Sequence, residues 1–286
     1  MQIGFIGLGV MGHPMAGHLA KAGHGVQVFN RSADKAKAWS AAHGGIAHDT
    51  AAGAADGCEM VVLCVGNDDD VRGLVAGILP VMARGAIIVD HTTTSAKLAK
   101  AMAQQAMALG RSFLDAPVSG GQAGAVNGAL TIMIGGDQAA YDRAVPVLSA
   151  YAKAIRHMGE AGSGQLAKMV NQICIAGVVQ GLAEAVHFAK NAGLDTDAVL
   201  AAISQGAAQS WQMDNRWKTM VEGQYEFGFA VDWMRKDLGL VLDEARANGS
   251  QLALTALVDQ FYAEVQAMGG NRWDTSSLAA RLKASS

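Results

Sequence analysis

The sequence predicts an α/β protein in which a doubly wound parallel sheet is followed by an all-α domain, with one long interdomain helix joining them. Three observations support this prediction. Short apolar runs alternate with alanine-rich stretches over residues 1–162, and a glycine motif directly follows the first run. From residue 163 onward the strand-like runs stop and helical patterns continue. We therefore expect two domains, at 1–162 and 163–286.

The first element is a short apolar run over residues 3–6, which glycines end and a helical stretch over 14–22 follows. This is the order strand, turn, helix. Further runs have the length and composition of buried strands, and they lie at 26–29, 60–65, 86–89, 112–114 and 130–134. Because strands that alternate with helices form parallel sheets covered on both faces, these runs predict one such sheet.

A single helix of unusual length is predicted over residues 164–190, within an interdomain segment at 163–192, because the stretch contains neither proline nor a long polar break. At the usual rise it extends about 40 Å. Its middle, 173–179, is apolar all round, which indicates burial between domains or subunits and favours a homodimer or homotetramer. Further helices are expected after the capping groups at 195–197, and over 233–247 and 252–268.

Composition excludes several classes of protein. The 286 residues carry a formal net charge of only -3, so no clustered basic surface and no nucleic-acid partner are expected. Three cysteines without CxxC spacing indicate a reducing cytoplasm, and the N-terminus lacks the features of a signal peptide. The longest apolar run, 173–179, is far shorter than the roughly 18–20 residues that span a bilayer. The eight histidines show no HExxH spacing, and no metal is expected.

The glycine motif fits GxGxxG between a strand and a helix, the placement typical of a Rossmann-type dinucleotide site. The first glycine makes the tight turn, the second lets the backbone approach pyrophosphate, and the third permits close packing of helix on sheet. Amides at the helix start can receive the anion. A merely tight turn is the alternative. The predicted contacts are Gly7, Leu8, Gly9, Val10, Met11 and Gly12.

The end of the second strand discriminates between the two nicotinamide cofactors. An acid there would hold the ribose 2′-hydroxyl of NAD, whereas an arginine accommodates a 2′-phosphate. The sequence has Asn30, Arg31 and Ser32 at this place, and no acid. A guanidinium with two small hydrogen-bonding neighbours suits phosphate, so NADP is the first choice and NAD the second. In the alternative reading, Arg31 is a solvated turn residue.

Four ordered segments together carry a family resemblance. They are IGFIGLGVMGHPMAGHL from Ile3, DAPVSGGQAGA from Asp115, GSGQLAKMVNQ from Gly162 and RKDLGL from Arg235. On these segments the chain resembles, over nearly its whole length, the 3-hydroxyacid dehydrogenases that include 3-hydroxyisobutyrate dehydrogenase, tartronate semialdehyde reductase, and glyoxylate or succinic semialdehyde reductases.

The resemblance implies that Lys168 is the catalytic acid/base and that Asn171 assists it. Positions i, i+3 and i+4 share a helix face, so Gln172 can point into the same cleft. Alcohol oxidation needs a group that takes the hydroxyl proton as hydride leaves, and a lysine of lowered pKa meets that need. A surface lysine on an amphipathic helix is the alternative, although the neighbours of Lys168 are apolar.

The resemblance also assigns Ser119, Gly120 and Gly121 to the substrate carboxylate, and a hydroxyl with glycine-exposed amides can donate to an anion. Lys236 matches the lysine that closes over the site near cofactor and substrate, whereas Asp237 is interpreted as structural. The loops flanking the nicotinamide are matched by Val65, Gly66 and Thr93.

This sequence departs from the family pattern at three places. Gly66 replaces a proline, residues 91–94 (HTTT) replace the familiar STI, and Gln172 stands where many relatives have a second asparagine. These changes leave the loop shape open, and His91 could approach the cofactor loop. Three tryptophans are assigned either to the substrate end of the cleft or to packing, namely Trp211, Trp217 and Trp233.

Taken together, these patterns predict a cytoplasmic oxidoreductase that moves a hydride between NADP(H) and a small carboxylate-bearing 3-hydroxy acid or its semialdehyde. An imine reductase shares the architecture but usually has another residue at the position of Lys168. A non-catalytic dinucleotide-binding module is the second alternative. Several hydroxy acids and semialdehydes remain open as substrates.

Overall fold

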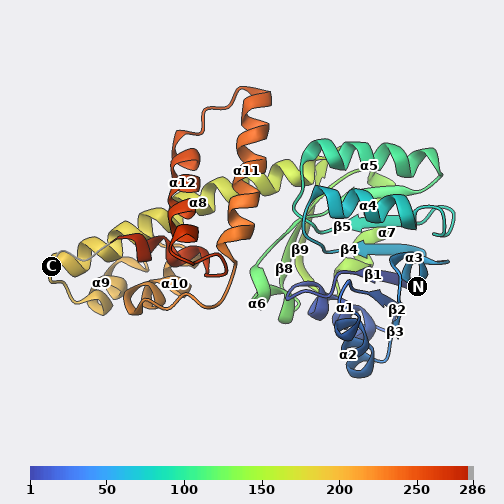
Figure 1. The fold of residues 1–286 in the computed structure, drawn as a ribbon, viewed down its shortest axis with the longest axis horizontal. Helices are drawn as coiled ribbons and strands as arrows, with labels where there is room; N and C mark the ends of the chain where they lie inside the picture. Colours follow the sequence, from blue (N-terminus) through green and yellow to red (C-terminus); the bar gives the residue numbers. More distant parts are fainter. Residues whose placement is uncertain (283–286) are drawn as a thin grey trace. The chain divides into compact units, whose positions relative to one another are not determined.

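The computed structural model describes residues 1–282. The chain forms two compact units, one of residues 1–168 and one from residue 169 onward. The first contains the sheet with its flanking helices, and the second is helical (Figure 1). We refer to them as the sheet unit and the helical unit. The division falls within one helix, six residues after the boundary that the sequence predicts.

The sheet has the doubly wound strand order β3-β2-β1-β4-β5-β6, and all of these strands are parallel. Their bounds are β1 Gln2–Ile6, β2 Gly25–Phe29, β3 Ile46–Ala47, β4 Met60–Leu63, β5 Ile87–Asp90 and β6 Ser112–Asp115. Beyond β6, the sheet continues with β8 (Leu130–Gly135), which is antiparallel to both β6 and the short β7 (Val118–Ser119) and parallel to β9 (Ala152–Gly159). The order reverses between β1 and β4.

Alternate side chains of each buried strand enter two separate cores, one on each face of the sheet. On β4, Met60 and Val62 enter one core and Val61 and Leu63 the other. Helices α1 (Gly12–Lys21), α2 (Ala33–His43), α6 (Gly121–Val126) and α7 (Gln138–Leu148) pack on the first face; α3 (Ala51–Ala55), α4 (Asp68–Ile78) and α5 (Ala96–Ala108) pack on the second (Figure 1). The predicted covering of both faces is confirmed.

The structure confirms all six strands that the apolar runs predict, and it adds three. Two of the added strands, β3 and β7, are only two residues long. The third, β9, was missed because Lys153, Arg156 and His157 interrupt its apolar residues, and its side chains are only partly buried. A strand that is half exposed lacks the continuous apolar run by which buried strands are recognised.

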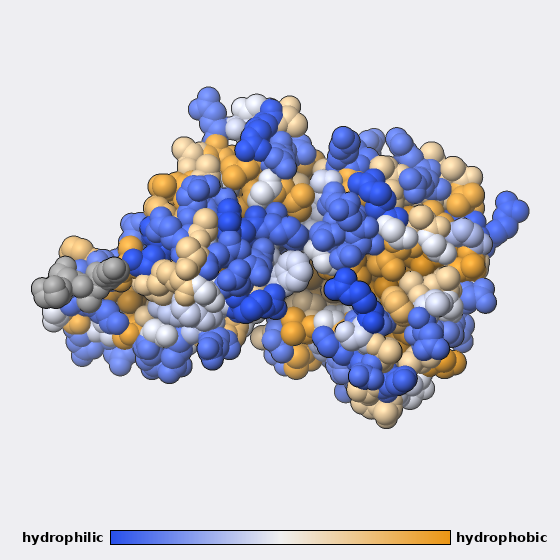
Figure 2. Space-filling model, viewed as in Figure 1, coloured by the Kyte–Doolittle hydropathy of each residue, from blue (hydrophilic) through white to orange (hydrophobic). Residues whose placement is uncertain are grey.

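Helix α8 (Ser163–Asn191) begins one residue before and ends one residue after the predicted 164–190, and the helical unit is built around its part from residue 169 onward. Trp217, Tyr262 and Leu278 fill its core, and Asp195 caps α9 as predicted by accepting from the amides of Asp197 and Ala198. The remaining elements are α9 (Thr196–Ile203), α10 (Trp211–Glu222), α11 (Val231–Asn248), α12 (Ala253–Ala267) and a final 3-10 helix, Thr275–Arg281. On the face shown in Figure 2, hydrophilic residues cover much of this unit, with hydrophobic ones scattered among them.

Helix α8 is buried along one side and exposed along another. Ala176 and Val179 belong to the core, whereas Val170, Val178 and Phe188 are exposed. By length and mean hydropathy alone, α8 is also the one helix among residues 1–282 that meets the requirement for crossing a membrane. Of its most apolar window, 44% is buried. The core helix of a water-soluble domain meets the same requirement, so this property is weak support for a membrane span.

Candidate active site

The cofactor residues predicted in the sheet unit follow the carboxyl ends of the parallel strands, whereas Lys236 lies on α11 (Val231–Asn248) in the helical unit. The glycine turn follows β1, and Val65 and Gly66 follow its neighbour β4. The chain leaves β1 for a helix on one face and β4 for a helix on the other. In open α/β sheets such a reversal leaves a crevice that takes the ligand. Strand topology therefore puts the glycine turn where a dinucleotide is expected to bind.

Two glycines of the turn are required by close backbone contacts. Gly7 has a φ of 101°, and a Cβ there would collide with the carbonyl group of Cys64. A Cβ on Gly12 would collide with the carbonyl oxygen of Gly7. By contrast, Gly9 is exposed and has open space where a side chain would be. The turn is thus tight on its inner side and open at the glycine that is expected to face pyrophosphate.

The start of α1 is suited to an anion because no side chain caps it. The N-cap residue is Met11, which cannot accept from the first-turn amides. Asn30 holds the turn from the end of β2, since its Oδ1 accepts from the Leu8 amide at 2.8 Å and its Nδ2 donates to the Ser32 carbonyl. Arg31 is exposed beside it. The residues present therefore fit a dinucleotide phosphate at this turn.

Two loops that carry other predicted cofactor residues are tied to each other. The Val65 amide donates to Thr92 Oγ1 at 3.1 Å, which joins the loop after β4 to the loop after β5. Asp68 on α4 accepts from both the amide and the hydroxyl of Ser95. The amide of Gly66 donates to Asp70 at 3.2 Å, a bond that the usual proline at this place has no N–H to make. Thr93 lies half-buried within the second loop.

His91 stands at the start of that second loop but is fully engaged inside the sheet unit. Its Nδ1 lies 2.6 Å from the Ala116 carbonyl oxygen and its Nε2 lies 2.8 Å from the Tyr151 hydroxyl. Burial lowers the pKa of His91 to about 4, against which the bond to Ala116 acts. The neutral ring donates through Nδ1 and accepts through Nε2. Both ring nitrogens of His91 are thus used in contacts with Ala116 and Tyr151, and these contacts hold the start of the loop in place.

The first turn of α8 is anchored on Asp115 at the end of β6. Its carboxylate accepts from the amides of Gly162 at 2.7 Å and Gln165 at 2.9 Å. Burial raises the pKa of Asp115 to about 6, while these amide bonds act in the opposite direction. Gly164 lies so close that a Cβ would stand 2.5 Å from the Met133 carbonyl oxygen and 2.6 Å from that of Asp115. The helix therefore starts directly against the sheet backbone.

Lys168 lies one turn further along α8 and is 8% exposed. Its Nζ donates to the carbonyl oxygen of Val118 at 2.9 Å. The residue after Val118 is Ser119, followed by Gly120 and Gly121, which are exposed and have positive φ. The predicted proton-transfer residue and the predicted carboxylate-binding segment are thus brought together within the sheet unit.

The remaining site residues form a chain of contacts inside the helical unit. Asn171 Nδ2 donates to Gln172 Oε1 at 2.8 Å, and Gln172 Nε2 donates to Asp237 Oδ2 at 2.7 Å. Lys236 Nζ lies 3.0 Å from Asp237 Oδ1 as an ion pair. Gln172 and Asp237 are each 2% exposed. Asn171 and Lys236 are thereby connected through two buried side chains, a link that the separate sequence motifs do not reveal.

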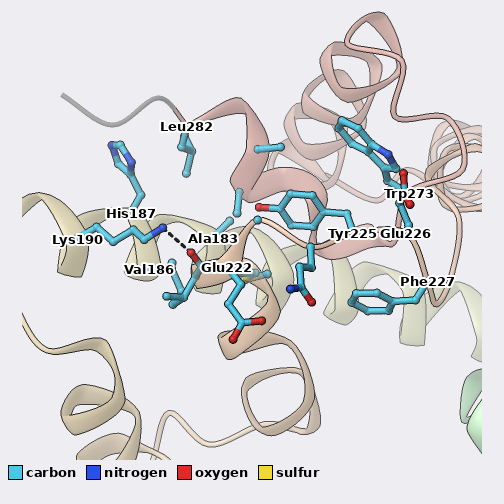
Figure 3. A pocket seen from close by; sticks show the side chains of 16 residues that line it. Ala183, Val186, His187, Lys190, Glu222, Tyr225, Glu226, Phe227, Trp273 and Leu282 are labelled. Atoms are coloured by element: carbon cyan, nitrogen blue, oxygen red, sulfur yellow. Dashed lines mark hydrogen bonds between the residues drawn. The ribbon is translucent and has the colours of Figure 1, made fainter. Parts of the chain in front are cut away.

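Pockets also occur in the helical unit, and Trp217 borders one of them, but their walls contain none of the residues predicted for catalysis, substrate binding or cofactor binding. One of about 850 Å³ lies between α8 and the segment after α10, and Figure 3 shows Lys190, Glu222, Tyr225 and Trp273 around it. Lys190 Nζ donates to the Val221 carbonyl across one side (Figure 3). Of the three tryptophans, Trp217 is buried and packs in the core, whereas Trp211 and Trp233 are partly exposed.

The described part of the chain, residues 1–282, holds no group of three His, Cys, Asp or Glu side chains placed to bind a metal ion. Its cysteines, Cys58, Cys64 and Cys174, are all free thiols. At the candidate site the described residues supply a lysine amine, backbone amides and hydroxyls in the same unit as a dinucleotide turn. This combination defines an NAD(P)-dependent oxidoreductase.

Comparisons with known proteins identify the family. Residues 2–159 match the NAD binding domain of 6-phosphogluconate dehydrogenase, and residues 162–282 match the NAD-binding domain described for NADP-dependent 3-hydroxyisobutyrate dehydrogenase. An uncharacterized oxidoreductase of Shewanella frigidimarina is 63% identical, with 99% of each chain covered. The 2-hydroxy-3-oxopropionate reductase of Escherichia coli is 34% identical, covering 99% of this chain and 97% of that one.

Among solved structures, 3-hydroxyisobutyrate dehydrogenase of Mycobacterium tuberculosis with L-serine superposes with a TM-score of 0.90 at 32% identity, covering 99% of each chain. The chain belongs to the 3-hydroxyacid dehydrogenase family. The family and its named members support NAD(P)-dependent hydroxyacid dehydrogenase activity. The resemblance predicted from four short segments is confirmed over the whole chain.

Proposed function

We propose that this protein transfers a hydride between NADP(H) and a small 3-hydroxy acid or the corresponding semialdehyde, with Lys168 as the general acid/base. The observation that carries the proposal is the position of the Lys168 amine, 2.9 Å from the carbonyl oxygen of Val118 and so beside the segment Ser119 to Gly121. The reacting hydroxyl and the carboxylate of a small acid would then both lie close to the Lys168 amine.

A nicotinamide cofactor bound at the glycine turn would supply the hydride acceptor for alcohol oxidation and the hydride donor for aldehyde reduction. Lys168 in its neutral form takes the hydroxyl proton as the C–H bond breaks, and the resulting ammonium releases that proton to water. In the reverse direction the ammonium protonates the developing alkoxide. Asn171, one helical turn further along α8, has the spacing to orient either the lysine or the substrate hydroxyl.

The substrate carboxylate is assigned to Ser119, Gly120 and Gly121, where a hydroxyl and two exposed backbone amides can donate. The family resemblance assigns Lys236 to the same step, and within the helical unit its Nζ lies 3.0 Å from Asp237 Oδ1 as an ion pair. The relative named 2-hydroxy-3-oxopropionate reductase and the dehydrogenase solved with L-serine are both described with a compound that combines a carboxylate with oxygen at the third carbon. Such compounds are the first candidates here.

For the cofactor, we propose NADP before NAD. Arg31 and Ser32 are exposed at the end of β2, and Ser32 is the N-cap residue of α2 without a hydrogen bond from its side chain to the helix. Lys35 adds a second exposed cation in the first turn, while Asp34 adds one opposing charge. A guanidinium with a hydroxyl neighbour binds a 2′-phosphate better than a ribose hydroxyl.

We further propose a homodimer or homotetramer that works in the cytoplasm. The exposed side of α8 carries Val170, Val178 and Phe188, with exposed fractions of 61%, 38% and 69%. Leu254 and Leu257 on α12 are about half exposed in the same unit. Apolar side chains at this density favour cover by a second copy of the chain.

The imine reductase alternative is disfavoured by Lys168, and the non-catalytic alternative by the pairing of Lys168 with the Ser119 segment. The deciding experiment measures NADPH absorbance during reduction of tartronate semialdehyde, succinic semialdehyde, glyoxylate and the semialdehyde of 3-hydroxyisobutyrate, and during oxidation of the matching hydroxy acids and L-serine, with each cofactor. We expect one or two of these compounds to be turned over. If cyclic imines are reduced while every hydroxy acid and semialdehyde is inert, the proposal is wrong.

A further inference from the structure

Gln165 is a fully buried polar side chain on α8, one helical turn before Lys168. A buried amide is costly unless both its oxygen and its nitrogen are hydrogen-bonded. Its sequence position lies in the motif around Lys168, but no sequence pattern assigns it a role. The hydrogen-bond partners of its side chain therefore explain why this position holds a glutamine.

Both ends of the Gln165 amide are bonded to the loop that carries Thr93. Its Oε1 accepts from the Thr94 amide at 3.0 Å, and its Nε2 donates to the Thr92 carbonyl oxygen at 2.8 Å. The two hydrogen bonds hold the backbone groups of Thr92 and Thr94, the residues on either side of Thr93. A side chain needs one donor and one acceptor at its tip to make both, which an amide has and a hydrocarbon or carboxylate lacks.

The backbone of Gln165 is fixed just as firmly. Its amide donates to Asp115 Oδ2 at 2.9 Å, and the Gly162 amide donates to the other oxygen of that carboxylate. Asp115 lies three residues before Val118, whose carbonyl holds the amine of Lys168. Thr92 in turn accepts from the Val65 amide through its hydroxyl. One buried network thus runs from both cofactor loops, through Gln165, to the turn of α8 that presents Lys168.

We propose that Gln165 is a positioning residue that holds the Thr93 loop, residues 91–95, at a fixed position relative to Lys168. We call its two side-chain bonds to this loop the Gln165 clamp. It acts through Thr92 and Thr94 rather than on the reacting atoms. The loop is expected to place the nicotinamide, and the lysine is expected to receive the proton, so hydride and proton transfer need these two parts at a constant separation. Misplacement by about 1 Å can cost about 100-fold in rate. The kinetic side of this proposal rests on the proposed role of Lys168.

The first test measures the clamp itself and does not depend on activity. Gln165→Met keeps the length of the side chain and removes both bonds. We expect amide hydrogen exchange in the peptide that contains Thr94 to quicken by about tenfold or more, because the Thr94 amide loses its acceptor. Gln180→Met is the matched control, since Gln180 is also buried on α8 but bonds to Glu184. Unchanged exchange at Thr94 in Gln165→Met overturns the proposal.

The second test is kinetic. In single-turnover reactions with the best substrate, Gln165→Met should lower the rate of hydride transfer by about 10–100-fold. The dissociation constant of NADPH should change by less than about threefold, because the glycine turn is intact. Gln180→Met should leave both values close to those of the wild type. Equal losses in the two variants would mean a merely structural role and would contradict the proposal.

Gln165→Glu provides a pH-dependent rescue that packing alone cannot produce. The ionised carboxylate can accept from Thr94 but has no donor for Thr92, whereas the protonated acid has both a carbonyl and a hydroxyl and restores both bonds. Burial favours the protonated form. The rate of this variant relative to wild type should therefore rise as pH falls from about 8 to about 5. Asp115, Asp90 and Lys168 lie around this network in both proteins, so the ratio isolates position 165.

These outcomes separate the two proposals. If the wild type turns over none of the candidate substrates, the proposed function fails, and the exchange measurement still decides the clamp. If the wild type is active and Gln165→Glu shows a constant rate ratio across this pH range, the clamp is overturned and the function stands. Should Gln165→Met fail to fold, Gln165→Leu removes the same two bonds, and exchange at the Thr94 amide in that variant answers the same question.

Discussion

The amine of Lys168 donates a 2.9 Å hydrogen bond to the carbonyl oxygen of Val118, the residue just before Ser119. This bond crosses from helix α8 to the short strand β7. It holds a long, flexible side chain in one conformation, which lowers the entropy lost when a substrate arrives. The same bond aligns the lysine with the segment that is expected to bind the carboxylate.

We predict that Lys168→Ala separates chemistry from cofactor binding. General acid–base groups contribute about 10²–10⁴-fold in rate, so kcat should fall by at least about 100-fold while the dissociation constant of NADPH stays nearly unchanged. Steady-state NADPH absorbance measures kcat, single-turnover absorbance measures the rate of hydride transfer, and fluorescence titration measures the dissociation constant. Lys190→Ala is the control, because Lys190 is on the same helix and also donates to a backbone carbonyl. Near-normal hydride transfer in Lys168→Ala would remove this lysine from the mechanism.

We predict that Arg31→Asp shifts the cofactor preference from NADPH toward NADH. A charge-assisted contact with the 2′-phosphate is worth about 1.5–3 kcal/mol, so NADPH affinity should drop by about 10–150-fold. The new carboxylate can also accept from a ribose hydroxyl. The ratio of the two dissociation constants is the readout. Arg84→Asp, an equal change of charge at another exposed site of the sheet unit, should keep the original ratio. A wild type that prefers NADH refutes the assignment.

We predict that Asp237→Asn lowers stability and weakens substrate binding together. Asp237 accepts from Gln172 and pairs with Lys236, so its neutralisation leaves a buried donor poorly matched and the lysine less well held. The free energy of unfolding should fall by about 1–3 kcal/mol, and KM for the acid should rise more than the dissociation constant of NADPH. Asp259→Asn breaks a comparable contact with Arg235 on the same helix and serves as the control. If both variants raise KM equally, the effect is not specific to Lys236.

We predict that the free energy of unfolding falls in acid because His91 resists protonation in the folded protein. Its pKa is lowered from 6.5 to about 4 in the folded protein, so the unfolded chain binds more protons in this window and stability falls as pH falls through it. The loss amounts to about 3 kcal/mol. Asp115 acts in the opposite direction, because its raised pKa of about 6 makes the folded state the stronger proton binder.

The difference between wild type and His91→Gln isolates the histidine, since Asp115 is present in both. The unfolding free energy of the variant, measured by urea titration at several pH values, should lose the His91-dependent part of the decline. His157→Gln should keep that decline, because it leaves His91 and its bonds to Ala116 and Tyr151 intact. A variant that follows the wild-type curve would show that His91 does not titrate as its burial requires.

We predict that Val178→Glu disrupts the oligomer. A charge in the exposed apolar side of α8 must be buried without a partner if a second copy covers this side. Sedimentation at micromolar concentration should show an oligomer for the wild type and a smaller species for the variant. Met107→Glu changes another exposed apolar residue, on α5, and should leave the sedimentation coefficient unchanged. A monomeric wild type rules out the proposed assembly.

The sequence predicted the parts of this protein whose signals are local. The run before Gly7, the glycine spacing and the unbroken helix around Lys168 can each be recognised without tertiary contacts. The strand β9 could not, because half-exposed positions lack an apolar pattern. The bonds of Gln165 and Asp237 could not either, because a buried polar residue is recognised only by partners that lie far away in the sequence. The motifs located the site, and tertiary contacts reveal what supports it.

The tight fit of Gly164 against the sheet has a consequence for how this sequence can vary or be engineered. Any larger residue there must move the carbonyl groups of Met133 or Asp115, or lift the start of α8. Lys168 lies four residues along the same helix, so a lifted helix carries the lysine away from Val118. Position 164 should therefore accept fewer substitutions in a library of variants selected for activity than in a library selected for folding alone. A position with no functional group thus limits which sequences can retain the reaction.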